Sequence, residues 1–255
     1  MPTLFSQGLL SEFVERIVLS NHGKGCYDFH EVTNMYQTTN DPETSLELSK
    51  MFHEIKNPLT LINSSLQLIE SEHPEVKSFR FWNQTMKDLQ NLRILINDLS
   101  SFQKSNMLNV TKINLFDFTE DLLESTESYL LETGTSLTLE CAAFDLDFYA
   151  DDVKLRQAII NLLKNAAESS DAGTPIELRI TADEQNLYIS VKDQGCGIKK
   201  EHLAHIFEPF HTTKSYGTGL GLPIVKKIID SHNGTISIDS EEGAGTTFLI
   251  SLPLL

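Results

Sequence analysis

His53, Glu54 and Asn57 place an imidazole, a carboxylate and an amide close together in the chain. A neutral imidazole is a nucleophile, and an adjacent carboxylate can take or orient its ring proton. Apolar residues recur around this group at alternating steps of four and three, which is typical of a helix-bundle helix; they are Leu48, Phe52, Ile55, Leu59, Ile62, Leu66 and Ile69. Because a helix turns by about 100° per residue, the three polar side chains fall outside this seam. The pattern predicts a helix that presents them to solvent.

A second set of residues could hold a phosphorylated nucleotide. Asn161 and Asn165 share one face of a predicted helix, and an amide oxygen there suits Mg²⁺. Asp193 ends a predicted strand just before Gly195 and Gly197. Its carboxylate could accept a hydrogen bond from an exocyclic amine, while the glycines allow the backbone to approach a ligand closely.

Two further glycine clusters follow. Gly217-Thr218-Gly219-Leu220-Gly221-Leu222 leads into a predicted helix, whose N-terminal N–H groups can bind phosphate oxygens. Gly243-Ala244-Gly245-Thr246-Thr247-Phe248 forms a last glycine turn before the closing strand. Each cluster alone could be a simple tight turn, and His53 alone could be an ordinary exposed histidine. The order and spacing of all of them favour the chemical interpretation.

Together with Phe207-Glu208-Pro209-Phe210, these clusters resemble the N, G1, F, G2 and G3 boxes of the ATP-binding domain of sensor histidine kinases. Gyrase shares that superfamily. The resemblance covers roughly residues 110–255. Residues 45–105 likewise resemble the dimerisation and phosphoacceptor domain, with the segment from His53 to Leu59 as its H box. Glu168 stands where many members carry Lys or Arg, a pattern that resembles the nitrogen-regulation and sporulation subtype.

The resemblance implies ATP and Mg²⁺ as ligands. It implies that Asn165 binds Mg²⁺, with Asn161 nearby, and that Asp193 recognises the adenine amino group. The other implied nucleotide contacts lie in the glycine turns, the lid of residues 198–216 and the last strand; they are Gly195 and Gly197 at the base, Gly217, Gly219, Leu220 and Gly221 at the phosphates, Lys214 of the lid, and Thr246 in the adenine network.

The activity implied by the resemblance is ATP-dependent autophosphorylation of His53, with His53, Glu54 and Asn57 as the catalytic group. Transfer to an aspartate of a response-regulator receiver domain would follow. Glu54 and Asn57 also resemble the pair with which some members position water for phosphatase activity. Two alternatives remain open: a catalytically silent dimeric scaffold that docks a receiver domain, and an ATPase or protein-serine kinase of the same superfamily.

The elements that must position these residues fall into two predicted domains. In residues 45–107, one helix runs to about Glu72 with Pro58 loosening or kinking it, and a second starts near Val76. Such an antiparallel hairpin has little partner surface, so a homodimeric four-helix bundle is expected, although packing on its own downstream domain is an alternative. Residues 110–255 alternate short strands and helices, which predicts an α+β two-layer sandwich. The role of residues 1–44 is unknown, and Leu9 to Val18 contain an apolar stripe that fits one helix.

Composition narrows the class of partner and the compartment. The 20 Lys and Arg residues against 36 Asp and Glu give a net charge of -16, which argues against nucleic-acid or anionic-membrane surfaces. The apolar runs are too short to span a bilayer, and the N-terminus lacks a basic signal-peptide region. The three widely spaced cysteines indicate neither a disulfide framework nor a metal site. We therefore expect a cytoplasmic protein without membrane insertion.

Overall fold

The structure, a computed structural model, describes residues 42–143, 145–214 and 217–254, apart from the side chains of residues 42–47. The apolar stripe between Leu9 and Val18 lies outside the described residues. Among those that are described, none of the helices has both the length and the apolar composition needed to cross a bilayer.

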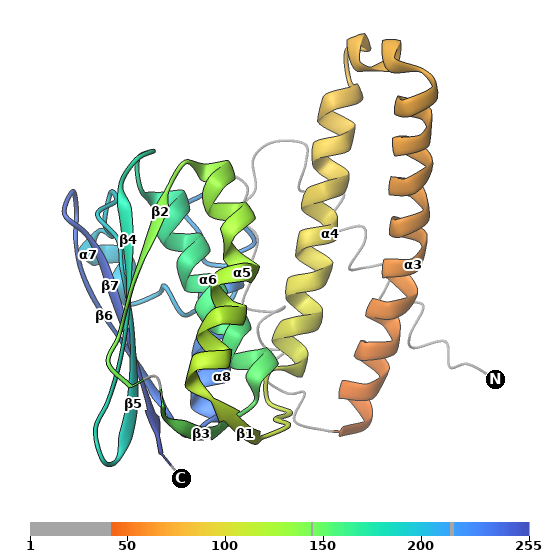
Figure 1. The fold of residues 1–255 in the computed structure, drawn as a ribbon. Helices are drawn as coiled ribbons and strands as arrows, with labels where there is room; N and C mark the ends of the chain where they lie inside the picture. Colours follow the sequence, from red (N-terminus) through yellow and green to blue (C-terminus); the bar gives the residue numbers. More distant parts are fainter. Residues whose placement is uncertain (1–41, 144, 215–216, 255) are drawn as a thin grey trace. The chain divides into compact units, whose positions relative to one another are not determined.

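The predicted helical hairpin is confirmed (Figure 1). It consists of α3 (Pro42–Glu72), the 3₁₀ turn η2 (Pro74–Ser78) and α4 (Trp82–Lys104). Helix α3 continues through Pro58. The predicted start of the second helix near Val76 is wrong, because Pro74 opens a separate turn and Phe79 then adopts an extended backbone conformation (φ -70°, ψ 134°). Helix α4 therefore begins only at Trp82.

Side chains at the turn tie the two arms of the hairpin together. Glu70 accepts a hydrogen bond from Trp82 Nε1 at 3.1 Å and pairs with Lys77 at 2.9 Å.

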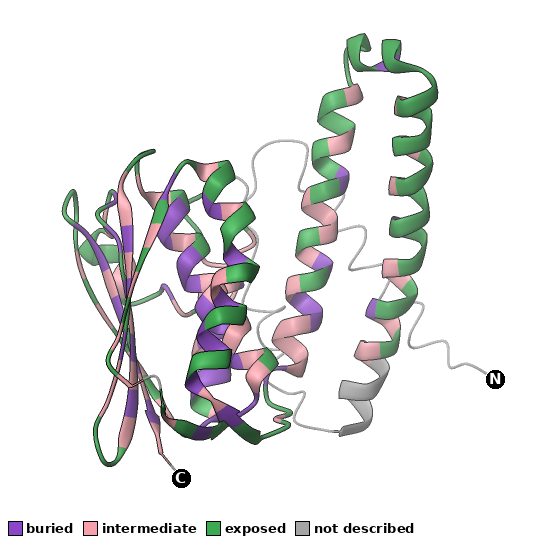
Figure 2. Cartoon of the chain, viewed as in Figure 1, coloured by how far each residue is buried: buried purple, intermediate pink, exposed green. Residues whose placement is uncertain are grey.

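Burial differs along the hairpin. Nearer the open end, Phe52 of α3 and Ile96 and Leu99 of α4 are buried. The part toward the turn is mostly exposed, as Figure 2 shows. Its exposed large apolar residues are Leu61, Ile62, Leu68, Ile69, Phe79, Phe81 and Ile94.

The remaining residues form a two-layer α+β domain (Figure 1). Its sheet has the order β2-β4-β5-β7-β6, in which β2 and β4 are parallel and the other neighbours antiparallel. Helices α5, α6 and α8 cover one face. The elements are β1 (Thr111–Asn114), α5 (Leu115–Thr133), β2 (Ser136–Cys141), β3 (Asp147–Ala150), α6 (Asp152–Ser169), β4 (Pro175–Ala182), β5 (Asn186–Lys192), α7 (Lys200–Leu203), α8 (Gly221–Ser231), β6 (Thr235–Glu241) and β7 (Gly245–Pro253).

The predicted sandwich is thus confirmed, with two elements added. Strand β3 pairs with β1 outside the main sheet, and Ile113 stands opposite Phe148 in that pair. Strand β3 is recognised from its pairing with β1. The other added element is the single helical turn α7.

Candidate functional site

His53 lies on the exposed surface of α3, as do Glu54 and Asn57. This confirms the predicted orientation of the three side chains. The imidazole Nε2 lies 3.4 Å from Lys104 Nζ at the end of α4. An ammonium group only donates, so Nε2 can accept from Lys104 in the tautomer that carries the ring proton on Nδ1.

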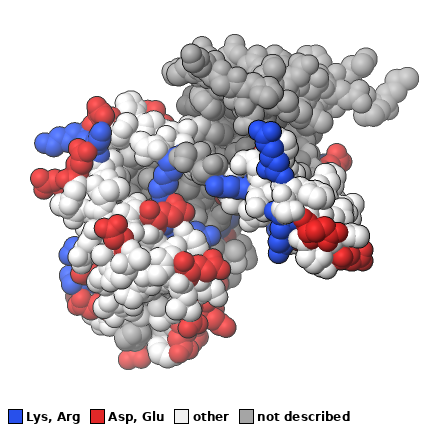
Figure 3. All heavy atoms as spheres, turned by 90° about the horizontal axis from the view of Figure 1, so that it is seen from above, with Lys and Arg blue, Asp and Glu red and all other residues white. Residues whose placement is uncertain are grey.

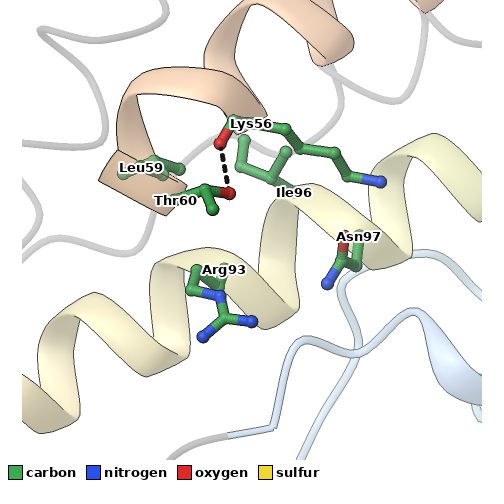
Figure 4. Close-up of a pocket in the computed structure, with 6 residues that line it drawn as sticks. All are labelled: Lys56, Leu59, Thr60, Arg93, Ile96 and Asn97. Carbon is green, nitrogen blue, oxygen red and sulfur yellow. Dashed lines mark hydrogen bonds between the residues drawn. The ribbon is translucent and has the colours of Figure 1, made fainter. Parts of the chain in front are cut away.

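A small hollow lies between α3 and α4, one turn beyond His53 (Figure 4). Lys56 and Arg93 bring positive charge to its rim, and Leu59 and Ile96 supply apolar surface. The Thr60 hydroxyl donates a hydrogen bond to the Lys56 carbonyl at 2.9 Å. This hollow belongs to the hairpin and contains none of the residues predicted to hold the nucleotide.

Helix α6 positions the two asparagines. It begins at the cap residue Asp151, whose carboxylate accepts a bond from Lys154 N. Asn161 Nδ2 donates to the carbonyl of Gly221 at 3.4 Å, which links α6 to the first residue of α8. Asn165 Oδ1 lies 3.5 Å from Lys214 Nζ of the lid. The fold therefore places the predicted metal ligand beside the predicted phosphate contact.

Asp193 is buried where β5 ends. Its Oδ1 atom accepts hydrogen bonds from the backbone N–H groups of Gly195 at 2.9 Å and Thr246 at 3.2 Å. Burial raises the pKa of the Asp193 carboxyl, while these two bonds and the Lys214 charge oppose the rise. Both bonds within the described chain go to Oδ1, which leaves Oδ2 to accept a bond from a ligand amine.

The glycines beside Asp193 are required by close backbone contacts. A Cβ at Gly195 would lie 2.2 Å from the Ser169 carbonyl oxygen, and one at Gly197 would lie 2.0 Å from the Glu241 carbonyl oxygen. Gly197 also has a positive φ of 66°. These two positions therefore hold the Asp193 turn against α6 and β6. Their predicted contact with an adenine base stays a prediction.

His232 and His205 of this domain have partners within the described chain. His232, buried after the end of α8, caps that helix: Nδ1 donates to the Ile228 carbonyl at 2.8 Å, and Nε2 accepts from Asp151 N at 2.9 Å. His205 pairs with Glu208 at 2.9 Å on the surface. Among the described residues, no group of His, Cys, Asp and Glu is arranged to hold a metal ion.

Two contacts link α4 to the candidate phosphate site, and neither was predicted. The Thr218 hydroxyl donates to Asp98 Oδ2 at 2.6 Å. Lys227 of α8 donates to the Phe102 carbonyl at 3.0 Å and lies 4.4 Å from the centre of the Phe102 ring. The alternative that the hairpin packs on its own downstream domain is thus partly realised, through α4.

The Asp98 contact leads to a prediction about stability. Burial raises the pKa of Asp98, so the folded state favours the protonated carboxyl. The preference of the folded state for the protonated Asp98 carboxyl therefore stabilises the fold at low pH. This stabilisation is present in full below the ordinary pKa of 3.8 and is lost as the pH rises through the folded-state pKa. At pH 7, Asp98→Asn keeps an acceptor for Thr218 and removes a half-buried charge. We expect the Tm at pH 7 to rise by about 1–3 °C.

Thermal unfolding followed by circular dichroism between pH 4 and pH 8 tests this. The difference in Tm between Asp98→Asn and the original chain should shrink toward pH 4. A lower Tm for Asp98→Asn at pH 7 would show that the charged carboxylate stabilises this contact instead.

Positive and negative side chains are mixed on one face of the described residues (Figure 3). On the face shown in Figure 3, Lys and Arg side chains of the described residues are scattered among Asp and Glu. They form no continuous basic patch on that face.

The predicted nucleotide residues thus fall into two neighbouring groups. Asn165 and Lys214 lie together, and Asp193 lies with Gly195 and Thr246. Sequence reasoning missed Lys104, Asp98, and the bonds of Glu168 to Tyr129 and Lys214. Of these, only the position of Lys104 could have been predicted from the sequence. A hairpin that turns near Pro74 brings the end of α4 opposite His53.

Comparison with known proteins finds related sequences. Residues 150–255 match the family described as histidine kinase-, DNA gyrase B- and HSP90-like ATPase. Sporulation kinase A of Bacillus subtilis (strain 168) is 34% identical over 79% of this chain and 33% of its own length. Sensor histidine kinase WalK of the same organism is 31% identical over 93% of this chain and 41% of its own length. The chain therefore spans less than half of each of these relatives.

Solved structures extend the comparison. The nucleotide-free catalytic domain of the histidine kinase ThkA is 32% identical, with a TM-score of 0.53, and the match covers 57% of this chain and 96% of that domain. Full-length ShkA, solved in complex with AMPPNP, has the same fold over 82% of this chain and 45% of its own, with a TM-score of 0.68 and 23% identity. Since the ThkA domain is matched almost completely, this chain belongs to the sensor histidine kinase family.

Proposed function

We propose that the chain is an ATP-dependent protein histidine kinase that phosphorylates His53 and passes the phosphoryl group to an aspartate of a response-regulator receiver domain. The observation that carries this proposal is the exposed imidazole of His53, which lies beside Lys104, in a chain that also contains the ATPase fold. The proposed division is a phosphoacceptor hairpin in residues 45–107 and an ATP-binding domain in residues 110–255.

ATP fits the residues of the proposed site. Asp193 Oδ2 can accept a bond from the adenine amino group, because Oδ1 takes both backbone bonds. The proposed lining of the site also includes Gly195, Gly197 and Thr246 around the base. Around the phosphates it includes Asn161, Lys214, Gly217, Gly219, Leu220 and Gly221.

Asn165 is the proposed Mg²⁺ ligand, because its neutral oxygen is a hard donor. When bound, Mg²⁺ neutralises charge that develops on the phosphates. Lys214, whose ammonium group lies beside Asn165, supplies further positive charge from the chain itself.

In the proposed reaction, the Nε2 lone pair of His53 attacks the γ-phosphorus. A nitrogen–phosphorus bond forms, the bond to the β,γ-bridging oxygen breaks, and ADP leaves with that electron pair. Glu54 or solvent takes the Nδ1 proton. The transition state of phosphoryl transfer is loose, so positioning and charge neutralisation supply most of the catalysis.

Incubation of the purified chain with γ-labelled ATP and Mg²⁺ tests the proposal. We expect a labelled protein whose phosphate is lost in acid and kept in base, and whose label moves to a receiver domain when one is added. An acid-stable label would indicate a protein-serine kinase instead. Nucleotide binding without any label would favour the silent scaffold.

A phosphatase activity is the second proposed function, and it rests on Glu54 and Asn57, which share the exposed surface with His53. We expect Asn57→Ala to slow dephosphorylation of a phosphorylated receiver by roughly tenfold or more in the presence of ADP, because an orienting hydrogen bond to water is lost. Autophosphorylation should persist. An unchanged dephosphorylation rate would make Asn57 an ordinary solvated residue.

A homodimer is proposed from the apolar surface of the hairpin. Leu61, Ile62 and Leu68 are 69%, 48% and 58% exposed in the single chain. A four-helix bundle of two hairpins would bury them.

Ile62→Asp is expected to weaken the dimer by at least about tenfold, because an unpaired charge would enter the interface. Sedimentation velocity over a concentration series measures this. Gln67→Asp places the same charge on the same helix about 140° away and should leave the dimer unchanged. Equal effects of both variants would contradict this interface.

A further inference from the structure

Glu168 lies at the centre of a network that joins α5, α6 and the lid. Its Oε1 atom accepts a hydrogen bond from the Tyr129 hydroxyl at 3.0 Å. Its Oε2 atom lies 2.5 Å from Lys214 Nζ. Both carboxylate oxygens therefore have a partner, one from α5 and one from the lid. The carboxylate pairs with the lid lysine.

The same network reaches the proposed metal ligand. Lys214 Nζ also lies 3.5 Å from Asn165 Oδ1. Glu168 and Asn165 are three residues apart in α6, so their side chains lie on the same face. A negative charge thus stands beside the proposed phosphate site and neutralises the cation proposed to contact the phosphates.

The pairing of Glu168 with Lys214 affects how phosphates can bind. Without a metal ion, incoming phosphates meet the Glu168 carboxylate and a lysine that is already paired. With Mg²⁺, the added positive charge offsets the carboxylate, and Lys214 can exchange Glu168 for a phosphate oxygen. The half-exposed side chains, at 39% for Lys214 and 45% for Glu168, limit the size of the effect because solvent screens the pair.

We propose that Glu168 is a positioning residue that acts through Lys214: it holds the lid in the nucleotide-free protein and makes nucleotide binding depend on Mg²⁺. This inference rests on the proposed nucleotide function and assigns a role to a residue outside the proposed catalytic and binding set.

A double-mutant cycle with the full chain tests the coupling. ADP dissociation constants are measured by calorimetry in EDTA and in Mg²⁺ for the original chain, Glu168→Gln, Lys214→Met and the double variant. We expect Glu168→Gln to tighten ADP binding in EDTA by roughly two- to fivefold, the range that a half-exposed ion pair supports. In Mg²⁺ the gain should be smaller. In the Lys214→Met background it should disappear.

Glu177→Gln is the matched control. Glu177 pairs with Lys192 at 3.6 Å on the sheet, and the pair is similarly exposed. The change in net charge is identical, and we expect ADP binding to stay the same. If Glu177→Gln tightened ADP binding as much as Glu168→Gln does, the change in net charge alone would explain the effect. That result would overturn the proposal.

Hydrogen exchange of the nucleotide-free protein provides an independent measurement. Lid amides in residues 205–214 should exchange faster in Glu168→Gln than in the original chain, because the tether of Lys214 is lost. Unchanged exchange would overturn the holding role. It would do so even if the original chain bound no ADP, an outcome that would separately refute the proposed function.

Two outcomes of the cycle contradict the proposal directly. If Glu168→Gln weakens ADP binding in Mg²⁺ but not in EDTA, Glu168 is a metal ligand. If the effects of Glu168→Gln and Lys214→Met are additive, the two residues act independently.

Discussion

Replacement of His53 by Gln should abolish acid-labile phosphate incorporation from ATP. Gln keeps a polar side chain of similar length but has no nucleophilic nitrogen lone pair, so no nitrogen–phosphorus bond can form. His53 is exposed on α3, so folding and nucleotide binding should be preserved. We expect the ADP dissociation constant to change by less than about twofold, as for independent sites. Labelling with γ-labelled ATP, with calorimetry alongside, measures both quantities.

His73 provides the matched control for this experiment. It is an exposed histidine at the turn of the same hairpin and pairs with nearby Glu75 at 3.1 Å. His73→Gln should keep full labelling. Persistent acid-labile label in His53→Gln would show that another histidine is the acceptor, and would remove the basis for the proposed mechanism.

Replacement of Asp193 by Asn should weaken adenine nucleotide binding by at least about hundredfold. The new amide oxygen can still accept the two backbone bonds that Asp193 Oδ1 accepts from Gly195 and Thr246. The amide NH₂ group would then take the place of Oδ2 and face the adenine amino group, donor against donor. The buried position leaves little water to relieve this mismatch.

Inosine nucleotides make this prediction specific to the base. Inosine carries a carbonyl where adenosine carries the amino group, so the amide NH₂ group introduced by Asp193→Asn could donate to it. We expect this variant to bind ADP less tightly than IDP, whereas the original chain prefers ADP. Competition calorimetry at pH 7.5 measures the ratio. If the variant bound both nucleotides more weakly by the same factor and had a lower Tm, Asp193 would have only a structural role.

Local patterns in the sequence predicted much of the fold. The alternating apolar seam of α3 predicted a long helix with His53 outside it, and the alternation of short strands and helices in residues 110–255 predicted the α+β class. These predictions are correct because a periodicity of 3.6 or 2 residues reflects which side of an element is buried. The predicted start of α4 was wrong because a 3₁₀ turn after Pro74 has no periodic signal.

The candidate site required both the sequence and the tertiary structure to be described. Residue types and spacing marked His53, the pair Asn161 and Asn165, and Asp193 as candidates, and the resemblance to sensor histidine kinases implied their roles. The partners of these residues come from distant parts of the chain: Lys104 stands beside His53, Lys214 beside Asn165, and Thr246 beside Asp193. Such pairs depend on how helices, lid and sheet pack together, and sequence spacing carries no information about that.

The sequence by itself determined which side chains could do chemistry, and it determined the helical or extended state of the segments that hold them. Only the tertiary structure decided the placement of Lys104 beside His53, the burial of Asp193 and the pairing of Lys214 with Glu168. The physical reason is that hydrogen bonding, desolvation and ion pairing depend on atoms a few ångströms away, and those atoms belong to residues far apart in the chain.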